Sequence, residues 1–564
     1  MTQTFRVAAM LAITALLSPG ASAEDWSRFR GPLGNAVSSS DKVPTTWSPS
    51  ANLSWKTELP GPGASSPIVV GGKAFVTCYS GYGLEKENPG EIENLVRHLV
   101  CVDLATGNKD WQKDVPVSLP EDPYTGIGVT AHGYASHTPV SDGKNVYAFF
   151  GKGGVHAFDM DGNALWNAQV GKESDPAKWG SSSSPVVFEN IVIVTASAES
   201  QAIVGLDRET GNEVWRQEAK GLDNMWGTPS LVKVADDRTE LVMCVAKELW
   251  GLDPRTGELL WYADATGAQQ AYASIVQSGK KVFAFTGRGG GSIALEVGGK
   301  GNISDSNTVW TGRDSASFAS PVGHDGKLYL VTRGVLTVVD AESGKRLEQL
   351  RLKGVQQTGG RFGSLDYPSP IVVGDRLYYL NGSGQMFVFS LGDKTQQIAL
   401  NRFTTAKETF WGTPAVSDDR LVVRSEKHLY CIVDKNETVT QDAEMLAQAD
   451  QPAETDSQNS RGSSGSSGGR SRQFDPMSMF NDMDKDKDGK VSMQELEGNR
   501  MAEQLKRFDK DGDKAISKEE FTAGLATMSQ NRGGSGRSGS GRGGYGGRGE
   551  DKRPERPQRP KMAK

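Results

Sequence analysis

The chain has little of what metal-dependent or nucleophilic enzymes need. Only 4 of its 564 residues are cysteines and 6 are histidines, and the histidines are scattered. No His-Glu-x-x-His motif, cysteine-rich zinc pattern or nucleophile motif occurs. His132 and His137 share one segment, but two histidines without a third ligand are typical of packing or surface positions. We therefore assign no catalytic residue.

Long apolar runs are missing after the first 23 residues. Those residues begin with a basic side chain, Arg6, continue through an apolar stretch over 7–17 and end in Ala21-Ser22-Ala23, which is a pattern that signal peptidases cleave. The stretch is too short to span a membrane, and no cysteine follows the cut to carry a lipid. We expect cleavage after Ala23, no transmembrane segment, and a mature protein in the periplasm or outside the cell.

Neither charge nor cysteine content is extreme. The net charge is −6, which indicates no general affinity for nucleic acid. The cysteines are too few for a disulfide scaffold, although export allows single bridges. Cys78 and Cys101 fall in consecutive expected strands, where a bridge and two free thiols are both open alternatives. Cys244 and Cys431 lie in distant repeats and need no role beyond burial.

What the sequence does have is an internal repeat. A phrase of small residues, usually with proline and then an apolar strand, starts at residues 65, 136, 182, 227, 273, 319, 368 and 412. Several copies continue into a third strand, a glycine turn and a fourth strand with tryptophan. A period of about 40–50 residues with four strands is typical of β-propeller blades.

The two ends of the repeat predict how the ring closes. The last copy provides three strands before the chain turns polar after Asp434, and an extra tryptophan-bearing strand over 53–59 precedes the first copy. We expect this N-terminal strand to complete the eighth blade, which would protect the sheet edges. The predicted fold is an all-β eight-bladed propeller over residues 24–440.

The phrase Asp-x-x-Thr-Gly-x-x-x-Trp, at 103–111, 207–215 and 253–261, resembles the repeat of propellers of the pyrroloquinoline-quinone (PQQ) type. That superfamily contains quinoprotein dehydrogenases and the non-enzymatic outer-membrane assembly propeller, BamB. The resemblance implies the fold rather than an activity, because the repeat encodes blade docking. It also implies that the repeated tryptophans wedge between blades: Trp111, Trp166, Trp215, Trp261 and Trp310.

A second motif follows a change in composition. A polar linker over 441–473 leads to a segment, 474–528, whose first acidic loop matches the EF-hand calcium loop at every defining position. Gly489 permits the tight turn of this loop. Carboxylate, hydroxyl and carbonyl oxygens suit calcium, and the expected ligands are Asp484, Asp486, Asp488, the Lys490 carbonyl, Ser492 and Glu495.

The next loop departs from the EF-hand pattern at one position. Lys514 stands where glycine is expected, so a side chain must tolerate a left-handed conformation. The short spacing between the loops leaves open whether the two hands pair, and calcium could be structural or regulatory. The expected ligands of the second loop are Asp509, Asp511, Asp513, the Ala515 carbonyl, Ser517 and Glu520.

The last segment, 529–564, is basic and rich in glycine and arginine. Like the linker, it is predicted to be disordered, because it lacks the apolar residues that a core requires. In a cytoplasmic protein it would indicate RNA binding. Export instead favours contact with anionic envelope glycans or lipids, with mere solvation as the alternative.

One constellation indicates a ligand site on the propeller. Five aromatic residues precede the proline-equivalent position of successive blades by three places, and three arginines follow second strands that end on the same face of the ring. Such groups can line a funnel for a planar or anionic ligand, and ordinary packing is the alternative. The candidate cofactor-binding residues are Trp226, Tyr272, Phe318, Tyr367, Trp411, Arg288, Arg333 and Arg424.

Two functions fit these features. We favour a monomeric, exported, calcium-binding scaffold in the cell envelope, with a protein or glycan as partner. The alternative is a periplasmic PQQ-dependent alcohol or sugar dehydrogenase, in which an aspartate assists hydride transfer to a calcium-held quinone. Neither an adjacent cysteine pair nor a catalytic aspartate can be identified for it, so the question of enzyme activity stays open.

Overall fold

The computed structural model describes residues 25–439, apart from 127, 177, 268–269, 288–289 and 356–366, together with parts of 480–523, 555–557 and 561–562. These residues fall into two compact units, 1–451 with 552–564 and 452–551. The predicted signal peptide and the linker 441–473 lie outside the described residues. No helix within the described parts has the length and apolar character to cross a membrane.

The first unit is a propeller of eight sheets, as predicted. Each of the first four sheets contains four strands that are consecutive in the sequence. Blades one and two contain β3 (Ile68–Val70), β4 (Lys73–Ser80), β5 (Val96–Asp103), β6 (Lys109–Pro116), β7 (Val140–Ser141), β8 (Asn145–Phe149), β9 (Val155–Asp159) and β10 (Ala164–Ala168). Blades three and four contain β11 (Val186–Phe188), β12 (Ile191–Ala196), β13 (Ala202–Asp207), β14 (Glu213–Glu218), β15 (Ser230–Ala235), β16 (Arg238–Val245), β17 (Glu248–Leu252) and β18 (Leu259–Asp264).

The later blades repeat this four-stranded antiparallel pattern. Blades five and six contain β19 (Val276–Ser278), β20 (Lys281–Thr286), β21 (Gly291–Glu296), β23 (Thr308–Gly312), β24 (Val322–His324), β25 (Lys327–Thr332), β26 (Val335–Asp340) and β27 (Arg346–Arg351). Blades seven and eight contain β28 (Ile371–Val373), β29 (Arg376–Leu380), β30 (Gln385–Leu391), β31 (Thr395–Arg402), β32 (Ala415–Ser417), β33 (Arg420–Arg424), β34 (His428–Ile432) and β2 (Leu53–Glu58).

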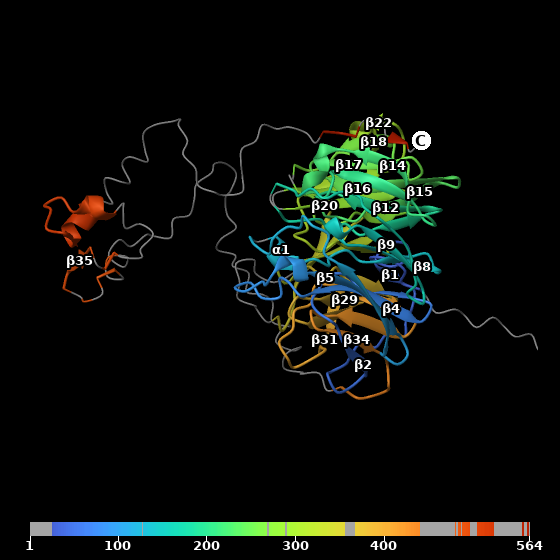
Figure 1. The fold of residues 1–564 in the computed structure, drawn as a ribbon, viewed down its shortest axis with the longest axis horizontal. Helices are drawn as coiled ribbons and strands as arrows, with labels where there is room; N and C mark the ends of the chain where they lie inside the picture. Colours follow the sequence, from blue (N-terminus) through green and yellow to red (C-terminus); the bar gives the residue numbers. More distant parts are fainter. Residues whose placement is uncertain are drawn as a thin grey trace, which may run out of the picture. The chain divides into compact units, whose positions relative to one another are not determined.

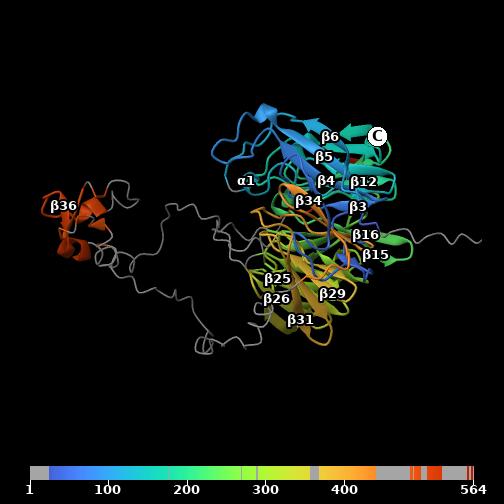
Figure 2. The same ribbon diagram turned by 90° about the horizontal axis from the view of Figure 1, so that it is seen from below.

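The ring closes as the sequence predicts. Strand β2, from the N-terminal part of the chain, pairs antiparallel with β34, with Trp55 opposite Cys431 (Figure 1). Figure 2 shows β4, β5 and β6 of the first blade beside β34 of the last. Because one blade contains strands from both ends of the repeat, opening the ring requires breaking a sheet.

Tryptophans join neighbouring blades at four of the five positions that the resemblance implies, whereas the indole of the fifth, Trp261, donates to Glu240 of its own blade at 2.7 Å. The Trp55 indole N–H donates to the Leu104 carbonyl at 2.9 Å, and a side-chain carbon at Gly107 would lie 2.6 Å from the Trp55 ring. The glycine in the turn between the third and fourth strands, which follows Thr, Asp or Ser and has a positive φ, is therefore the seat for the preceding blade's tryptophan. The same contact recurs for Trp111 on Gly162, Trp166 on Gly211, Trp215 on Gly257 and Trp310 on Gly344.

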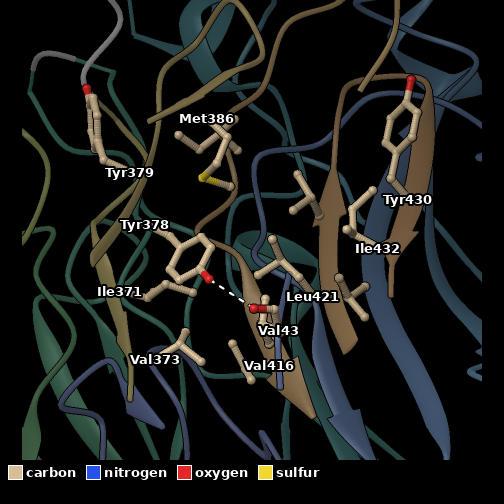
Figure 3. Packing of buried hydrophobic residues seen from close by; sticks show 14 of the residues in the cluster. Val43, Ile371, Val373, Tyr378, Tyr379, Met386, Val416, Leu421, Tyr430 and Ile432 are labelled. Atoms are coloured by element: carbon tan, nitrogen blue, oxygen red, sulfur yellow. Dashed lines mark hydrogen bonds between the residues drawn. The ribbon is translucent and has the colours of Figure 1, made fainter. Parts of the chain in front are cut away.

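Large side chains fill the space between the blades near the closure. Figure 3 shows this core, in which the Tyr378 hydroxyl donates to the Val43 carbonyl at 3.2 Å. Val43 belongs to the N-terminal segment, whose strand β1 (Val37–Ser38) pairs in parallel with β28. This segment therefore packs against blade seven before the chain enters β2.

The short helices lie in connections between strands. They are η1 (Ile92–Asn94), α1 (Val129–His132), η2 (Gly151–Gly153), η3 (Lys220–Asn224) and α2 (Ser304–Asn307). Strand β22 (Gly301–Asn302) adds to the outer edge of blade four through a parallel pairing with β18. Of these elements, α1 is the one that reaches the candidate site.

The open question about a disulfide is answered against it. All four cysteines are free and buried. The register of β4 and β5 places Cys78 opposite His98 and Cys101 opposite Phe75, so the two thiols are not cross-strand partners. The sequence identifies two neighbouring strands here but does not determine their register.

The second unit holds both acidic loops. Strands β35 (Lys490–Ser492) and β36 (Ala515–Ser517) pair antiparallel, with Val491 opposite Ile516, so the two loops do pair. The 3-10 turn η4 (Lys506–Phe508) precedes the second loop. Eight buried apolar side chains form the core of this unit: Phe480, Met483, Val491, Leu496, Leu505, Phe508, Ile516 and Phe521.

Part of the predicted disordered tail lies on the propeller instead. Strand β37 (Lys561–Met562) pairs antiparallel with β14, and Arg556 forms an ion pair with Glu248. Of the segment 529–564, the structure describes residues 555–557 and 561–562, and these residues have contacts on the propeller. The composition of the tail does not indicate that Arg556 and β37 contact Glu248 and β14.

Candidate functional site

Eight hydroxyl groups form a closed hydrogen-bonded ring about the propeller axis. Each accepts a hydrogen bond of 2.9 or 3.0 Å from the backbone N–H of the equivalent residue in the preceding blade, and the last link joins blade eight to blade one. The small residue before each proline-equivalent position thus ties the blades together. The ring consists of Ser66, Thr138, Ser184, Thr228, Ser274, Ser320, Ser369 and Thr413.

An arc of aromatic side chains lies over this ring. All five predicted aromatics are half-buried and line one hollow together with the hydroxyl ring. Successive ring centroids are 4.7–6.1 Å apart, and the Trp226 and Tyr272 rings are stacked. The Trp226 indole also donates to the Gly180 carbonyl at 2.9 Å, which fixes its orientation. The arc consists of Trp179, Trp226, Tyr272, Phe318, Tyr367 and Trp411.

The N-terminal segment contributes to the same hollow. Phe29 lines it, and the neighbouring Arg28 and Arg30 side chains donate to the carbonyls of the residues just before the inner strands of blades four, five and six. Burial lowers the pKa of Arg30 to about 9, helped by the nearby charge of Arg28. These arginines therefore brace the centre of the ring through neutral carbonyls.

The two predicted arginines that the structure describes, Arg333 and Arg424, do not line the hollow. Arg424 is fully buried and donates to the Ser65 hydroxyl at 3.1 Å and to the Thr77 carbonyl at 2.8 Å, so it braces blade eight against blade one. Arg333 is exposed and lies outside the lining. Arg288 lies outside the described residues. The hollow therefore has no Asp, Glu, Lys or Arg among its described lining residues.

This lining does not fit PQQ. The quinone carries three carboxylates, and buried anions need cationic partners or several hydrogen-bond donors with a metal ion. The described lining offers aromatic faces and hydroxyl groups, with His132 as its one basic side chain. Burial lowers the pKa of His132, so the imidazole is neutral near pH 7. We derive no quinone chemistry from this site.

A polar chamber adjoins the hollow and shares His132 and Ser136 with it. Lys152 pairs with Asp122 at 2.9 Å, and a further ion pair joins Arg97 to Glu121. Both pairs have side chains no more than 8% exposed. The chamber is thus a pre-formed charged network in blades one and two rather than an open surface.

Three further groups of this chamber form a chain of hydrogen bonds. The Ser181 hydroxyl donates to Glu199 Oε1 at 2.5 Å and contacts His137 Nε2 at 3.0 Å. Burial raises the pKa of Glu199 to about 7 and lowers the pKa of His137 to about 3. Glu199 Oε2 and His137 Nδ1 are buried without a partner among the described residues. Glu199 is therefore the group of this chamber that we expect to titrate near neutral pH.

The first acidic loop brings the predicted carboxylates together. Asp484, Asp486 and Asp488 each place an oxygen within 4.8 Å of the others. Asp484 Oδ1 is buried without a hydrogen-bond donor among the described residues, which leaves an acceptor for a cation. Glu495 accepts from the Ser492 N–H at 2.8 Å, which holds it at the end of the loop. These residues fit calcium, with the Lys490 carbonyl and Ser492 completing the donor set.

The second loop has the same design despite its lysine. Lys514 adopts φ +66°, the left-handed conformation that its position requires. Asp509, Asp511 and Glu520 gather oxygens within 4.8 Å, and backbone N–H groups, led by that of Ser517, lower the pKa of Glu520 to about 2. The Lys490 ammonium meets Asp513 at 2.6 Å and so links the two loops.

Sequence reasoning missed two parts of the funnel. Trp179 extends the aromatic arc but lies five residues before Ser184, whereas the predicted aromatics lie two residues before their ring hydroxyl. Because of this longer spacing, Trp179 does not match the pattern that identifies the other five aromatics. Phe29 precedes the whole repeat, and the contacts of Arg28 and Arg30 with blades four to six hold it at the hollow.

Comparison with known families agrees with this architecture. The family profile described as outer membrane protein assembly factor BamB matches residues 36–177, 96–350 and 199–443. An EF-hand profile matches residues 477–498. The first set of matches covers more than half of the chain. The protein therefore belongs to the BamB-like family of PQQ-type propellers and carries an EF-hand.

Individual relatives are distant. Tetrathionate hydrolase from Acidithiobacillus ferrooxidans is 22% identical over 333 residues, which are 47% of this chain and 62% of that protein. The chain thus spans less than two thirds of this relative. BamB from Moraxella catarrhalis aligns with 15% identity and TM-score 0.47, over 69% of this chain and 99% of its own. A europium-containing methanol dehydrogenase aligns with 11% identity and TM-score 0.48, over 73% of this chain and 98% of its own.

Proposed function

We propose that the protein is an exported, calcium-binding scaffold of the cell envelope whose funnel holds a neutral sugar unit of an envelope glycan. The observation that carries this proposal is the arc of six half-buried aromatic rings around a hollow with no charged residue in its described lining. Export rests on the pattern of residues 1–23, with cleavage after Ala23.

Sugar rings have the surface that this hollow complements. Their C–H faces pack on aromatic side chains, and their hydroxyl oxygens accept hydrogen bonds. All eight ring hydroxyls line the hollow and use an acceptor lone pair within the ring, and each can also donate its O–H to a ligand or to water. The hollow measures about 170 Å³, enough for on the order of ten water molecules. That is room for a ring, not for a folded partner.

Calcium is assigned to the two EF-hand loops. Each gathers three carboxylates within 4.8 Å, and the paired strands β35 and β36 couple the loops. Affinities of roughly 10⁻⁴–10⁻³ M suffice for extracellular modules, because calcium is abundant there. The module therefore works as a calcium-stabilised appendage of the scaffold.

Calorimetric titration of the mature protein tests the proposal. Neutral oligosaccharides and PQQ are titrated separately, with calcium and with a chelator. We expect saturable sugar binding that weakens about tenfold or more in Trp226→Ala and Tyr272→Ala, because each change removes a stacking face. Leu347→Ala, at an exposed position on β27, is the matched control and keeps the affinity.

The competing outcomes are distinct. Saturable PQQ binding that Trp226→Ala abolishes would overturn the sugar proposal and restore the dehydrogenase alternative. Heat from envelope proteins or peptides without any from sugars would indicate a protein partner instead. Sugar binding that is equally strong in Trp226→Ala would place the ligand outside the funnel.

A further inference from the structure

The end of the chain is held by the outer edge of blades three and four. Strand β37 extends blade three by pairing with β14, with Met562 opposite Trp215 and Lys561 opposite Arg216. Figure 1 shows the C-terminus beside β14, β18 and β22. An outer strand presents unpaired backbone groups, which an extended peptide can satisfy.

A buried carboxylate anchors the segment that precedes β37. Arg556 Nε lies 3.0 Å from Glu248 Oε2, and a terminal nitrogen lies 2.7 Å from Oε1, so the contact is bidentate. The Glu248 side chain is 1% exposed, and its other side-chain donor is the Trp250 indole at 2.8 Å. A buried carboxylate is strongly destabilising without a cation. Within the described residues, Arg556 is the cation that pairs with Glu248.

An aromatic face completes this anchor. The Arg556 guanidinium carbon lies 3.4 Å from the centroid of the Tyr262 ring. Arginine combines stacking on an aromatic face with bidentate contact to a carboxylate, which lysine does not. The exposed Lys220–Glu555 pair, at 3.5 Å, adds little. The site therefore selects an arginine.

We propose that this edge is a recognition site for an extended, arginine-bearing peptide, and that it is occupied by the chain's own C-terminal residues 555–557 and 561–562. The sequence around this occupant repeats Arg-Pro at 553–554, 556–557 and 559–560. Proline restricts the unbound chain and lowers the entropy lost on docking. The EF-hand module is then joined to the propeller unit at both of its ends in sequence.

Hydrogen exchange in the full mature protein tests this inference. We expect the β14 amides to exchange about tenfold faster in Arg556→Glu than in the native chain, because β37 no longer covers them. Arg553→Glu and Arg559→Glu change the same charge in the same Arg-Pro context. They are matched controls and leave β14 protected.

A charge swap makes the assignment specific. We expect the double variant Arg556→Glu with Glu248→Arg to restore part of the protection of the β14 amides. If the single variant Arg556→Glu protects these amides as well as the native chain does, the proposal is overturned. Equal loss in Arg553→Glu would show attraction by net charge alone and would also overturn it. Protection that rises with protein concentration would assign the site to the tail of a second copy instead of the chain's own.

Discussion

The propeller and the EF-hand module hold themselves together in opposite ways. The propeller joins its two ends in one blade, ties its centre with eight hydroxyl groups and seats tryptophans on glycines. The module has eight buried apolar side chains and two groups of carboxylates that repel one another. A core this small usually needs a metal ion or a cross-link.

This contrast predicts calcium dependence for one part of the chain. Closure makes the propeller's stability a property of many contacts, whereas we expect the module's stability to depend on an ion that neutralises its carboxylates. The two parts should therefore respond to different perturbations, and this separation can be measured.

Removing calcium should have the largest effect. We expect a chelator to abolish the cooperative unfolding transition of the module and to move that of the propeller by no more than about 2 °C. Calorimetry of the mature protein records both transitions. Glu520→Gln should weaken calcium binding about tenfold or more. Glu519→Gln, which changes the exposed neighbouring side chain, should leave calcium binding unchanged. If the unfolding temperature of the propeller falls as much as that of the module on chelation, the two parts do not differ in calcium dependence.

The closing strand comes next. Trp55→Ala should destabilise the propeller by about 3–5 kcal/mol in urea unfolding, because it removes a buried ring from its seat on Gly107. Leu165→Ala, on an exposed side chain, should stay within about 0.5 kcal/mol. Comparable losses in the two variants would mean that the inter-blade seat does not carry the closure.

A smaller effect should appear with pH. The pKa of Glu199 is raised to about 7 from 4.5, so its stabilising contribution is complete below about pH 4.5 and is lost as pH rises to 7. The full range amounts to about 3 kcal/mol. His137, whose pKa is lowered to about 3, acts in the opposite direction, and its contribution is lost as pH falls from 6.5.

Comparison with the variant Glu199→Gln separates the pH effect of Glu199 from that of His137. The difference in unfolding free energy between the native chain and Glu199→Gln should fall between pH 4.5 and 7 and stay level above that range. A difference that does not change with pH would show that Glu199 is not held protonated. The same difference should be insensitive to calcium if the two parts are independent.

The smallest effect should come from one link of the hydroxyl ring. Ser274→Ala leaves the buried Thr228 N–H without its acceptor and should cost about 1–2 kcal/mol. Ser274→Thr keeps an acceptor hydroxyl and serves as the control. Urea unfolding measures both, and equal stability of the alanine variant would mean that a water replaces the hydroxyl.

Sequence reasoning reached the fold because the repeat is local and periodic. The Thr-Gly-x-x-x-Trp phrase places a glycine and a tryptophan at fixed positions, and the contact between them repeats around the ring. The closure by residues 53–59 followed from counting strands. The EF-hand loops were equally direct, because every ligand position lies within one short segment.

What sequence reasoning missed depends on distant contacts or on register. The aromatic arc followed from spacing, but nothing local distinguishes Arg424, which is buried between blades, from an arginine that faces a ligand. Cys78 and Cys101 lie in paired strands whose register only the packing fixes. The docking of Arg556 on Glu248 joins residues that lie 308 positions apart.

The seat of Trp55 also bears on the order in which the chain folds. Its glycine and carbonyl partners, Gly107 and Leu104, belong to blade one, and Thr57 adds a hydrogen bond to the Gly107 carbonyl. When the chain emerges N-terminus first from a membrane during export, β2 can therefore dock on blade one long before residues 415–432 appear. The last blade then assembles on a strand that is already in place, so the ring is completed on a template.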